Sequence, residues 1–245
     1  MKKKVLLRIL ALVLILLAAA GYDYLKPYKP DRDALAAMQS SAAVTVTEEG
    51  GLLHFEPSNA GPTTVIFYPG GLVTPESYAP YAKELAGDGY RTFIVKMPLN
   101  LAVLGADRAD EVVDAWKGKT ERFIIGGHSL GGTMAARYAA SHAEVISGVF
   151  FMGSYPEAKG NLAQAGIPAL SVTGSRDGVL NRERFEESKK LLPADTVYFT
   201  VSGGNHSQFG SYGLQKGDNE AQTSPAAQRQ EVTDMMESWI SSLKP

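Results

Sequence analysis

Strand-like and helix-like segments alternate along most of this 245-residue chain. The strand-like segments are rich in apolar and β-branched residues, as expected for strands in a sheet that helices cover on both faces. A helix between two such strands returns the chain to the same edge, so the strands pair in parallel. The alternation therefore predicts an α/β fold with a mostly parallel sheet and helices on both faces. The expected strands are residues 63–68, 91–96, 123–126, 145–152, 169–173 and 196–201, and the expected helices are residues 77–86, 108–116, 130–140 and 182–191.

The two ends of this pattern differ from its middle. Residues 44–47 and 52–55 flank Glu49-Gly50-Gly51, which predicts an antiparallel hairpin before the first parallel strand. Near the other end, Ser224 and Pro225 mark the start of a helix. The apolar residues of this helix recur at helical spacing and are expected to face the core: Val232, Met235, Met236, Trp239, Ile240 and Leu243.

Composition excludes several classes of protein and of site. The chain has no cysteine, so it forms no disulfide and no thiolate metal site, and it has no cysteine nucleophile. Its four histidines are spread along the sequence, and neither a metal nor an organic cofactor is expected. The formal net charge is −2, and the Lys and Arg residues are scattered after the first few positions, which argues against a nucleic-acid-binding face.

The first 20 residues predict a separate targeting segment. Lysines at positions 2–4 precede an apolar run at residues 9–20 that ends in three alanines. This pattern fits a cleaved signal peptide, and it also fits a retained membrane anchor in which Arg8 reaches the lipid headgroups. Both alternatives place the rest of the chain outside the cytoplasmic membrane, either secreted or attached to the membrane. Residues 21–41 are then expected to form a stalk, and residues 42–245 the folded domain.

One strand-to-helix junction carries the sequence Gly-His-Ser-Leu-Gly at residues 127–131. An apolar strand precedes it and a helix follows it, which is the context of a nucleophile elbow. Because this turn is tight, the positions two residues before and after Ser129 must lack side chains. The hydroxyl stands at the amino end of the helix, where backbone N–H groups stabilise developing negative charge. Ser129 is therefore the candidate nucleophile, and His128 is expected to face away from its hydroxyl.

A serine nucleophile needs a base and an acid that orients the base. Asp177 and His206 each follow an expected strand, and His206 lies on a glycine-rich loop. Because parallel strands end at one edge of the sheet, both side chains are expected near Ser129. They also occur in the chain order serine, acid, histidine that this kind of site uses. Glu157 follows another strand and is the alternative acid.

The negative oxygen of an acyl-transfer intermediate needs two N–H donors. Leu130, directly after the candidate nucleophile, is expected to supply one of them. The second N–H donor is expected from the loop after the first parallel strand, where two successive glycines have no side chains to cover the backbone N–H groups. Gly71 is the favoured donor in this loop, and Leu72 is the alternative.

These motifs together resemble the α/β-hydrolase superfamily, and within it compact bacterial members related to the dienelactone-hydrolase and carboxylesterase groups. The resemblance covers residues 44–243 and implies that Ser129, Asp177 and His206 form a catalytic triad, with Gly71 and Leu130 as oxyanion donors. The motifs that carry it are Pro69-Gly70-Gly71, Gly127-His128-Ser129-Leu130-Gly131, Gly174-Ser175-Arg176-Asp177 and Gly204-Asn205-His206.

The chain departs from the family pattern in two places. Dienelactone hydrolases proper carry cysteine where this chain has Ser129, and the His-Gly-Gly-Gly run of lipases is replaced by Tyr68-Pro69-Gly70-Gly71.

The resemblance implies hydrolysis of small to medium carboxylic esters through an acyl-enzyme, with a small-molecule ester as the partner. Residues 153–168 are too few to hold a cap domain, so an open site is expected. The alternatives are acyltransferase or perhydrolase chemistry on the same fold, and a non-catalytic binding protein.

Overall fold

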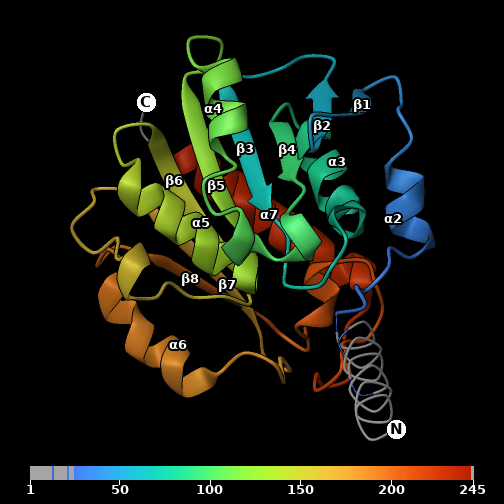
Figure 1. The fold of residues 1–245 in the computed structure, drawn as a ribbon, viewed down its shortest axis with the longest axis vertical. Helices are drawn as coiled ribbons and strands as arrows, with labels where there is room; N and C mark the ends of the chain where they lie inside the picture. Colours follow the sequence, from blue (N-terminus) through green and yellow to red (C-terminus); the bar gives the residue numbers. More distant parts are fainter. Residues whose placement is uncertain (1–12, 14–20, 22–24, 244–245) are drawn as a thin grey trace, which may run out of the picture.

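The computed structural model describes residues 13, 21 and 25–243 (Figure 1). The predicted signal or anchor segment, residues 1–20, therefore lies outside the described residues except for Val13. Within the described residues, no helix has the length and apolar character that a membrane span requires.

Eight strands form one sheet in the order β1-β2-β4-β3-β5-β6-β7-β8. β1 and β2 form an antiparallel hairpin, β2 pairs antiparallel with β4, and all the other neighbours are parallel. This confirms the predicted fold class and the hairpin at its start. The strands are β1 (Val44–Glu49), β2 (Leu52–Pro57), β3 (Thr63–Tyr68), β4 (Arg91–Val95), β5 (Arg122–His128), β6 (Ile146–Met152), β7 (Ala169–Gly174) and β8 (Val197–Val201).

Helices cover both faces of the sheet, because its central strands are apolar on both sides. All residues of β3, β4 and β7 are buried. Figure 1 shows α4 and α5 in front of the sheet and α7 behind it, and α3 packs with α7 in the same core cluster. The longer helices are α3 (Ala79–Gly87), α4 (Asp110–Trp116), α5 (Leu130–Ser141), α6 (Arg182–Ser188) and α7 (Pro225–Ser242).

The start of α7 agrees with its sequence signals, and the bounds of some other elements differ from those expected. Ser224 caps α7 through its side chain, as predicted. The helix expected from residue 77 instead begins as a 3₁₀ turn over Pro75–Tyr78 and becomes α-helical at Ala79. β5 continues two residues beyond the predicted end, because Gly127 and His128 still pair with β6. Glycine and histidine give no strand signal of their own, so this extension could not be read from composition.

The connections at the carboxyl edge are short. Between β6 and β7 the chain forms one 3₁₀ turn, Ala158–Gly160, and no other helix or strand in this fully described stretch, which agrees with the predicted absence of a cap.

The segment predicted as a stalk lies against the domain in its described part. Its helix α2 (Arg32–Ala37) contacts α3. The N–H of Tyr28 donates to the Leu72 carbonyl at 2.7 Å, and its ring contacts that of Tyr212.

Candidate active site

Ser129 occupies a strained turn between β5 and α5. Its backbone has φ 51° and ψ −124°, a region that residues with a side chain rarely adopt. A Cβ on Gly127 would lie 2.2 Å from the carbonyl oxygen of Tyr68, and a Cβ on Gly131 would lie 2.0 Å from the same oxygen. Both glycines are therefore needed for β3 to pass beside the turn, which explains the spacing seen in the sequence.

Asp177 and His206 form a buried pair at the ends of β7 and β8. Oδ2 of Asp177 lies 2.8 Å from Nδ1 of His206, and both side chains are at most 1% exposed. Oδ1 of Asp177 accepts from the N–H groups of Val179 and Leu180 at 2.9 and 2.7 Å. These two bonds fix the plane of the carboxylate, so that Oδ2 faces the imidazole. The alternative acid, Glu157, instead pairs with Arg137.

Ser129 and His206 line the same hollow, which has a volume of about 420 Å³. Nε2 of His206 is buried and has no hydrogen-bond partner in the part of the chain that the structure describes. The structure thus brings the three predicted residues to one edge of the sheet, with the Asp–His bond formed and the Ser–His bond not formed. In unliganded sites such catalytic bonds are often long, and they tighten in the substrate complex.

Backbone hydrogen bonds around the hollow distinguish Gly71 from Leu72, the two candidates for the second oxyanion donor. The N–H of Leu72 donates to the Asn100 carbonyl at 2.7 Å, so it is already engaged. The N–H groups of Gly71 and Leu130 donate to no acceptor among the described residues. The two positions are neighbours, because a Cβ on Gly71 would lie 3.4 Å from Cδ2 of Leu130. This geometry favours Gly71 over Leu72.

A buried network behind the pair was not visible in the sequence. The Oη of Tyr78 accepts from the N–H of Gly70 at 3.0 Å and lies 2.9 Å from Nδ1 of His128. The rings of His128 and His206 lie 4.4 Å apart, centroid to centroid. Tyr78 therefore ties the loop after β3 to the residue before Ser129. No motif marks this tyrosine, because it lies at the start of an ordinary amphipathic helix.

Burial holds the pKa of His128 well below its ordinary value of 6.5, and the neighbouring His206 lowers it further. Below about pH 6.5 the imidazole of His128 therefore takes up a proton in the unfolded chain but not in the folded protein. This group lowers the free energy of unfolding as the pH drops through this range. Burial of His54 acts in the same direction, because it also lowers that pKa.

We expect His128→Asn to flatten this acid dependence. Asparagine can still bond Tyr78 but does not take up a proton. The variant should be less stable than the wild type at pH 7, and its melting temperature should fall less steeply between pH 6.5 and 4.5. Thermal unfolding followed by circular dichroism across this range measures both slopes. Equal slopes would mean that His128 does not set the acid sensitivity.

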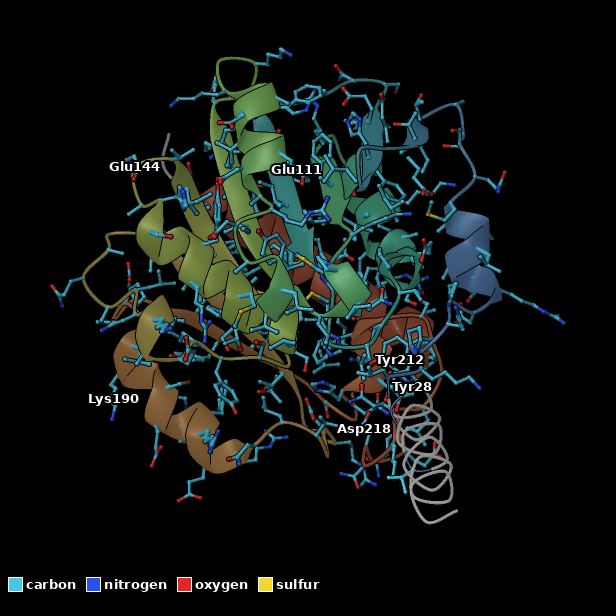
Figure 2. The ribbon with its side chains drawn as sticks, viewed as in Figure 1. Tyr28, Glu111, Glu144, Lys190, Tyr212 and Asp218 are labelled. Carbon is cyan, nitrogen blue, oxygen red and sulfur yellow. The ribbon has the colours of Figure 1, made fainter. Side chains whose placement is uncertain are left out.

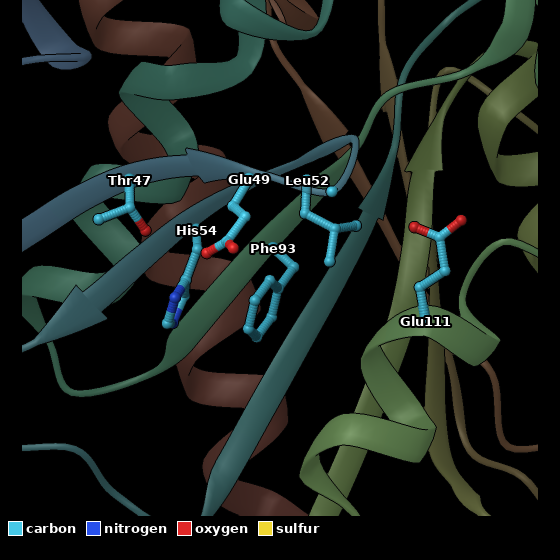
Figure 3. A pocket seen from close by; sticks show the side chains of 7 residues that line it. Thr47, Glu49, Leu52, His54, Phe93 and Glu111 are labelled. Atoms are coloured by element: carbon cyan, nitrogen blue, oxygen red, sulfur yellow. The ribbon is translucent and has the colours of Figure 1, made fainter.

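A second hollow, of about 480 Å³, lies between the β1–β2 hairpin and α4 (Figure 3). Two of its ionisable groups are already paired, since Glu111 bonds Arg108 at 2.9 Å and His54 bonds Glu56 at 2.8 Å. Neither Ser129 nor His206 lines it. Across the described residues, no group of three or more His, Asp or Glu side chains is placed to hold a metal ion.

Residues 64–230, more than half of the chain, match the model of the alpha/beta hydrolase family. Solved structures with a similar fold include an alpha/beta hydrolase enzyme from the metagenome of Mar Chica lagoon sediments in Morocco, with 18% identity over 80% of this chain and 98% of that one and a TM-score of 0.60. Est1E from Butyrivibrio proteoclasticus has 15% identity over 82% and 100% of the two chains and a TM-score of 0.57. A putative dienelactone hydrolase from Klebsiella pneumoniae has 15% identity over 82% and 99% and a TM-score of 0.60. No curated protein is similar enough in sequence to match.

Proposed function

We propose that this chain, which belongs to the alpha/beta hydrolase family, is a serine hydrolase that cleaves carboxylic esters of small to medium size. One observation carries the proposal. His206, which is bonded to the buried Asp177, lines the same hollow as a serine held in the strained turn of a nucleophile elbow. A serine, a histidine and a carboxylate in this relation have the parts that activate a hydroxyl for attack on a carbonyl.

In the proposed mechanism, Oγ of Ser129 attacks the ester carbonyl while Nε2 of His206 takes its proton. Asp177 keeps the Nδ1–H tautomer of the imidazole and stabilises the positive charge that forms on it. The N–H groups of Gly71 and Leu130 receive the negative oxygen of the intermediate. Collapse of the intermediate releases the alcohol, which takes the proton from His206. Water, activated by the same histidine, then hydrolyses the acyl-enzyme.

The walls of the hollow support esters of limited size. Val103, Tyr155, Val179 and Leu180 contribute apolar surface, and Arg137 and Glu157 form an ion pair at its side. The short connection between β6 and β7 leaves this hollow without a cap. An acyl chain gains about 0.8 kcal/mol for each methylene only while that methylene is buried. Long chains would therefore extend into water and gain nothing further.

A series of p-nitrophenyl esters of increasing acyl length tests this proposal. We expect kcat/KM to peak at short chains and to fall for long ones, without activation by an emulsified surface. The free acid should appear at the rate of p-nitrophenol release, which separates hydrolysis from acyl transfer. A preference for emulsified long-chain triglycerides would contradict the proposed substrate class.

A further inference from the structure

The loop that follows His206 returns to the active-site edge and brings Asp218 between the two functional loops. Oδ1 of Asp218 accepts from the N–H of Gly178 at 2.9 Å. Oδ2 accepts from the N–H and the hydroxyl of Ser207 at 2.7 and 2.6 Å. Gly178 directly follows Asp177, and Ser207 directly follows His206. One carboxylate is thus bonded to the residue after the acid and to the residue after the base.

Asn219 makes the matching contacts on the other side of the pair. Its Nδ2 donates to the Arg176 carbonyl at 3.0 Å, and its own carbonyl accepts from Nδ2 of Asn205 at 2.7 Å. Arg176 directly precedes Asp177, and Asn205 directly precedes His206. The dipeptide Asp218-Asn219 is therefore bonded to the residues on both sides of Asp177 and on both sides of His206. Figure 2 shows Asp218 at the same end of the molecule as Tyr28 and Tyr212.

This dipeptide approaches the acid loop so closely that only glycine fits at position 178. A Cβ there would lie 2.8 Å from Nδ2 of Asn219 and 2.9 Å from its backbone N. The last paired residues of β7 and β8 are Gly174 and Val201, so Asp177 and His206 lie beyond the parallel ladder. Ties outside the sheet are needed to hold the two loops in register, and Asp218-Asn219 makes five hydrogen bonds to these loops.

The charge of Asp218 strengthens these ties. Partial burial would raise its pKa, but the hydrogen bond from the Ser207 hydroxyl and the backbone N–H donors outweigh this and lower it. The carboxylate is therefore ionised at neutral pH. Hydrogen bonds to an ionised carboxylate are roughly twice as strong as those between neutral groups.

We propose that Asp218 and Asn219 are positioning residues, which set the distance and orientation of the Asp177–His206 pair. This inference rests on the proposed function of that pair. A small displacement of a catalytic group, of about 1 Å, lowers turnover by about 100-fold. The walls of the hollow that bind the ester would stay in place when the imidazole is displaced. The displacement should therefore lower kcat and leave KM nearly unchanged.

Asp218→Ala removes the three bonds from Gly178 and Ser207 to the carboxylate and the bond that it accepts from the N–H of Asn219. Gly178→Ala pushes the dipeptide away while leaving the carboxylate intact. We expect both to lower kcat for p-nitrophenyl acetate by about 10- to 100-fold per titrated active site, with KM within about twofold of the wild type. Glu220→Gln is the matched control, because its side chain is exposed and on the same loop. It should leave kcat unchanged. Asp218→Asn, which keeps the side-chain shape, replaces the alanine variant if that variant does not fold.

A readout independent of hydrolysis separates this inference from the proposed function. The proton on Nδ1 of His206 should give a far-downfield NMR signal in the wild type and in Glu220→Gln, because it is buried in the bond to Asp177. The signal should disappear or exchange rapidly in Asp218→Ala. A retained signal, or an unchanged kcat per titrated site in both variants, would overturn the positioning role. If the wild-type protein showed the NMR signal but no Ser129-dependent ester hydrolysis, only the proposed function would be contradicted.

Discussion

Replacing Ser129 with alanine should leave a folded protein whose ester turnover is lower by about 10⁴- to 10⁶-fold. The substitution removes the attacking oxygen and leaves the oxyanion donors and the walls of the hollow in place. Serine and alanine carry the same backbone strain at φ 51°, so little change in stability is expected. Steady-state hydrolysis of a short p-nitrophenyl ester, with the melting temperature measured in parallel, tests this result.

Ser141→Ala provides the control for this experiment. Ser141 ends the same helix that Leu130 begins, and its hydroxyl bonds only backbone carbonyls and the adjacent His142 in the described structure. It should retain full turnover. Retention of turnover in Ser129→Ala as well would remove the serine from the mechanism.

Asp177→Asn should lower turnover by roughly 10⁴-fold at neutral pH. The amide oxygen will occupy the position of Oδ1, because the N–H groups of Val179 and Leu180 both donate there. The amide NH₂ then faces Nδ1 of His206 and stabilises the tautomer that carries its proton on Nε2. In that form the imidazole has no free lone pair for the proton of the Ser129 hydroxyl. Measurement of kcat at pH 7 for the variant and the wild type tests this expectation.

Glu157→Gln is the matched comparison, since it makes the same chemical change at the other acid named from the sequence. It weakens only the pair with Arg137 at the side of the hollow and should change kcat little. If Glu157→Gln were the more damaging of the two substitutions, the acid would be the one that follows β6 and not the one that follows β7.

The fold could be predicted from the sequence because its signals are local. Segments rich in apolar and β-branched residues mark β3 and β6, and the spacing of Met236, Trp239 and Ile240 marks the buried face of α7. The candidate site could be predicted for a related reason. Its three residues each follow a strand, and parallel strands bring their carboxyl ends to one edge.

The contacts that support the site could not be predicted in the same way. The bond from Leu72 to Asn100, which favours Gly71 as the oxyanion donor, joins two loops that no pattern relates. Asp218 reaches Gly178 across 40 positions of the sequence, and its own segment reads as an ordinary polar loop. Such contacts depend on how loops pack against each other after the sheet has formed. They leave no periodic trace in the composition of either segment.

Covalent labelling with a fluorophosphonate probe tests whether Ser129 is an activated nucleophile. The serine oxygen attacks the phosphorus of this probe and displaces fluoride, a step that is fast when a base removes the hydroxyl proton and N–H donors receive the negative phosphoryl oxygen. Mass spectrometry of the labelled, proteolysed protein locates the adduct. We expect one adduct, on the peptide that contains Ser129, and none in Ser129→Ala. An unlabelled wild-type protein, or an adduct on any other residue, would contradict this expectation.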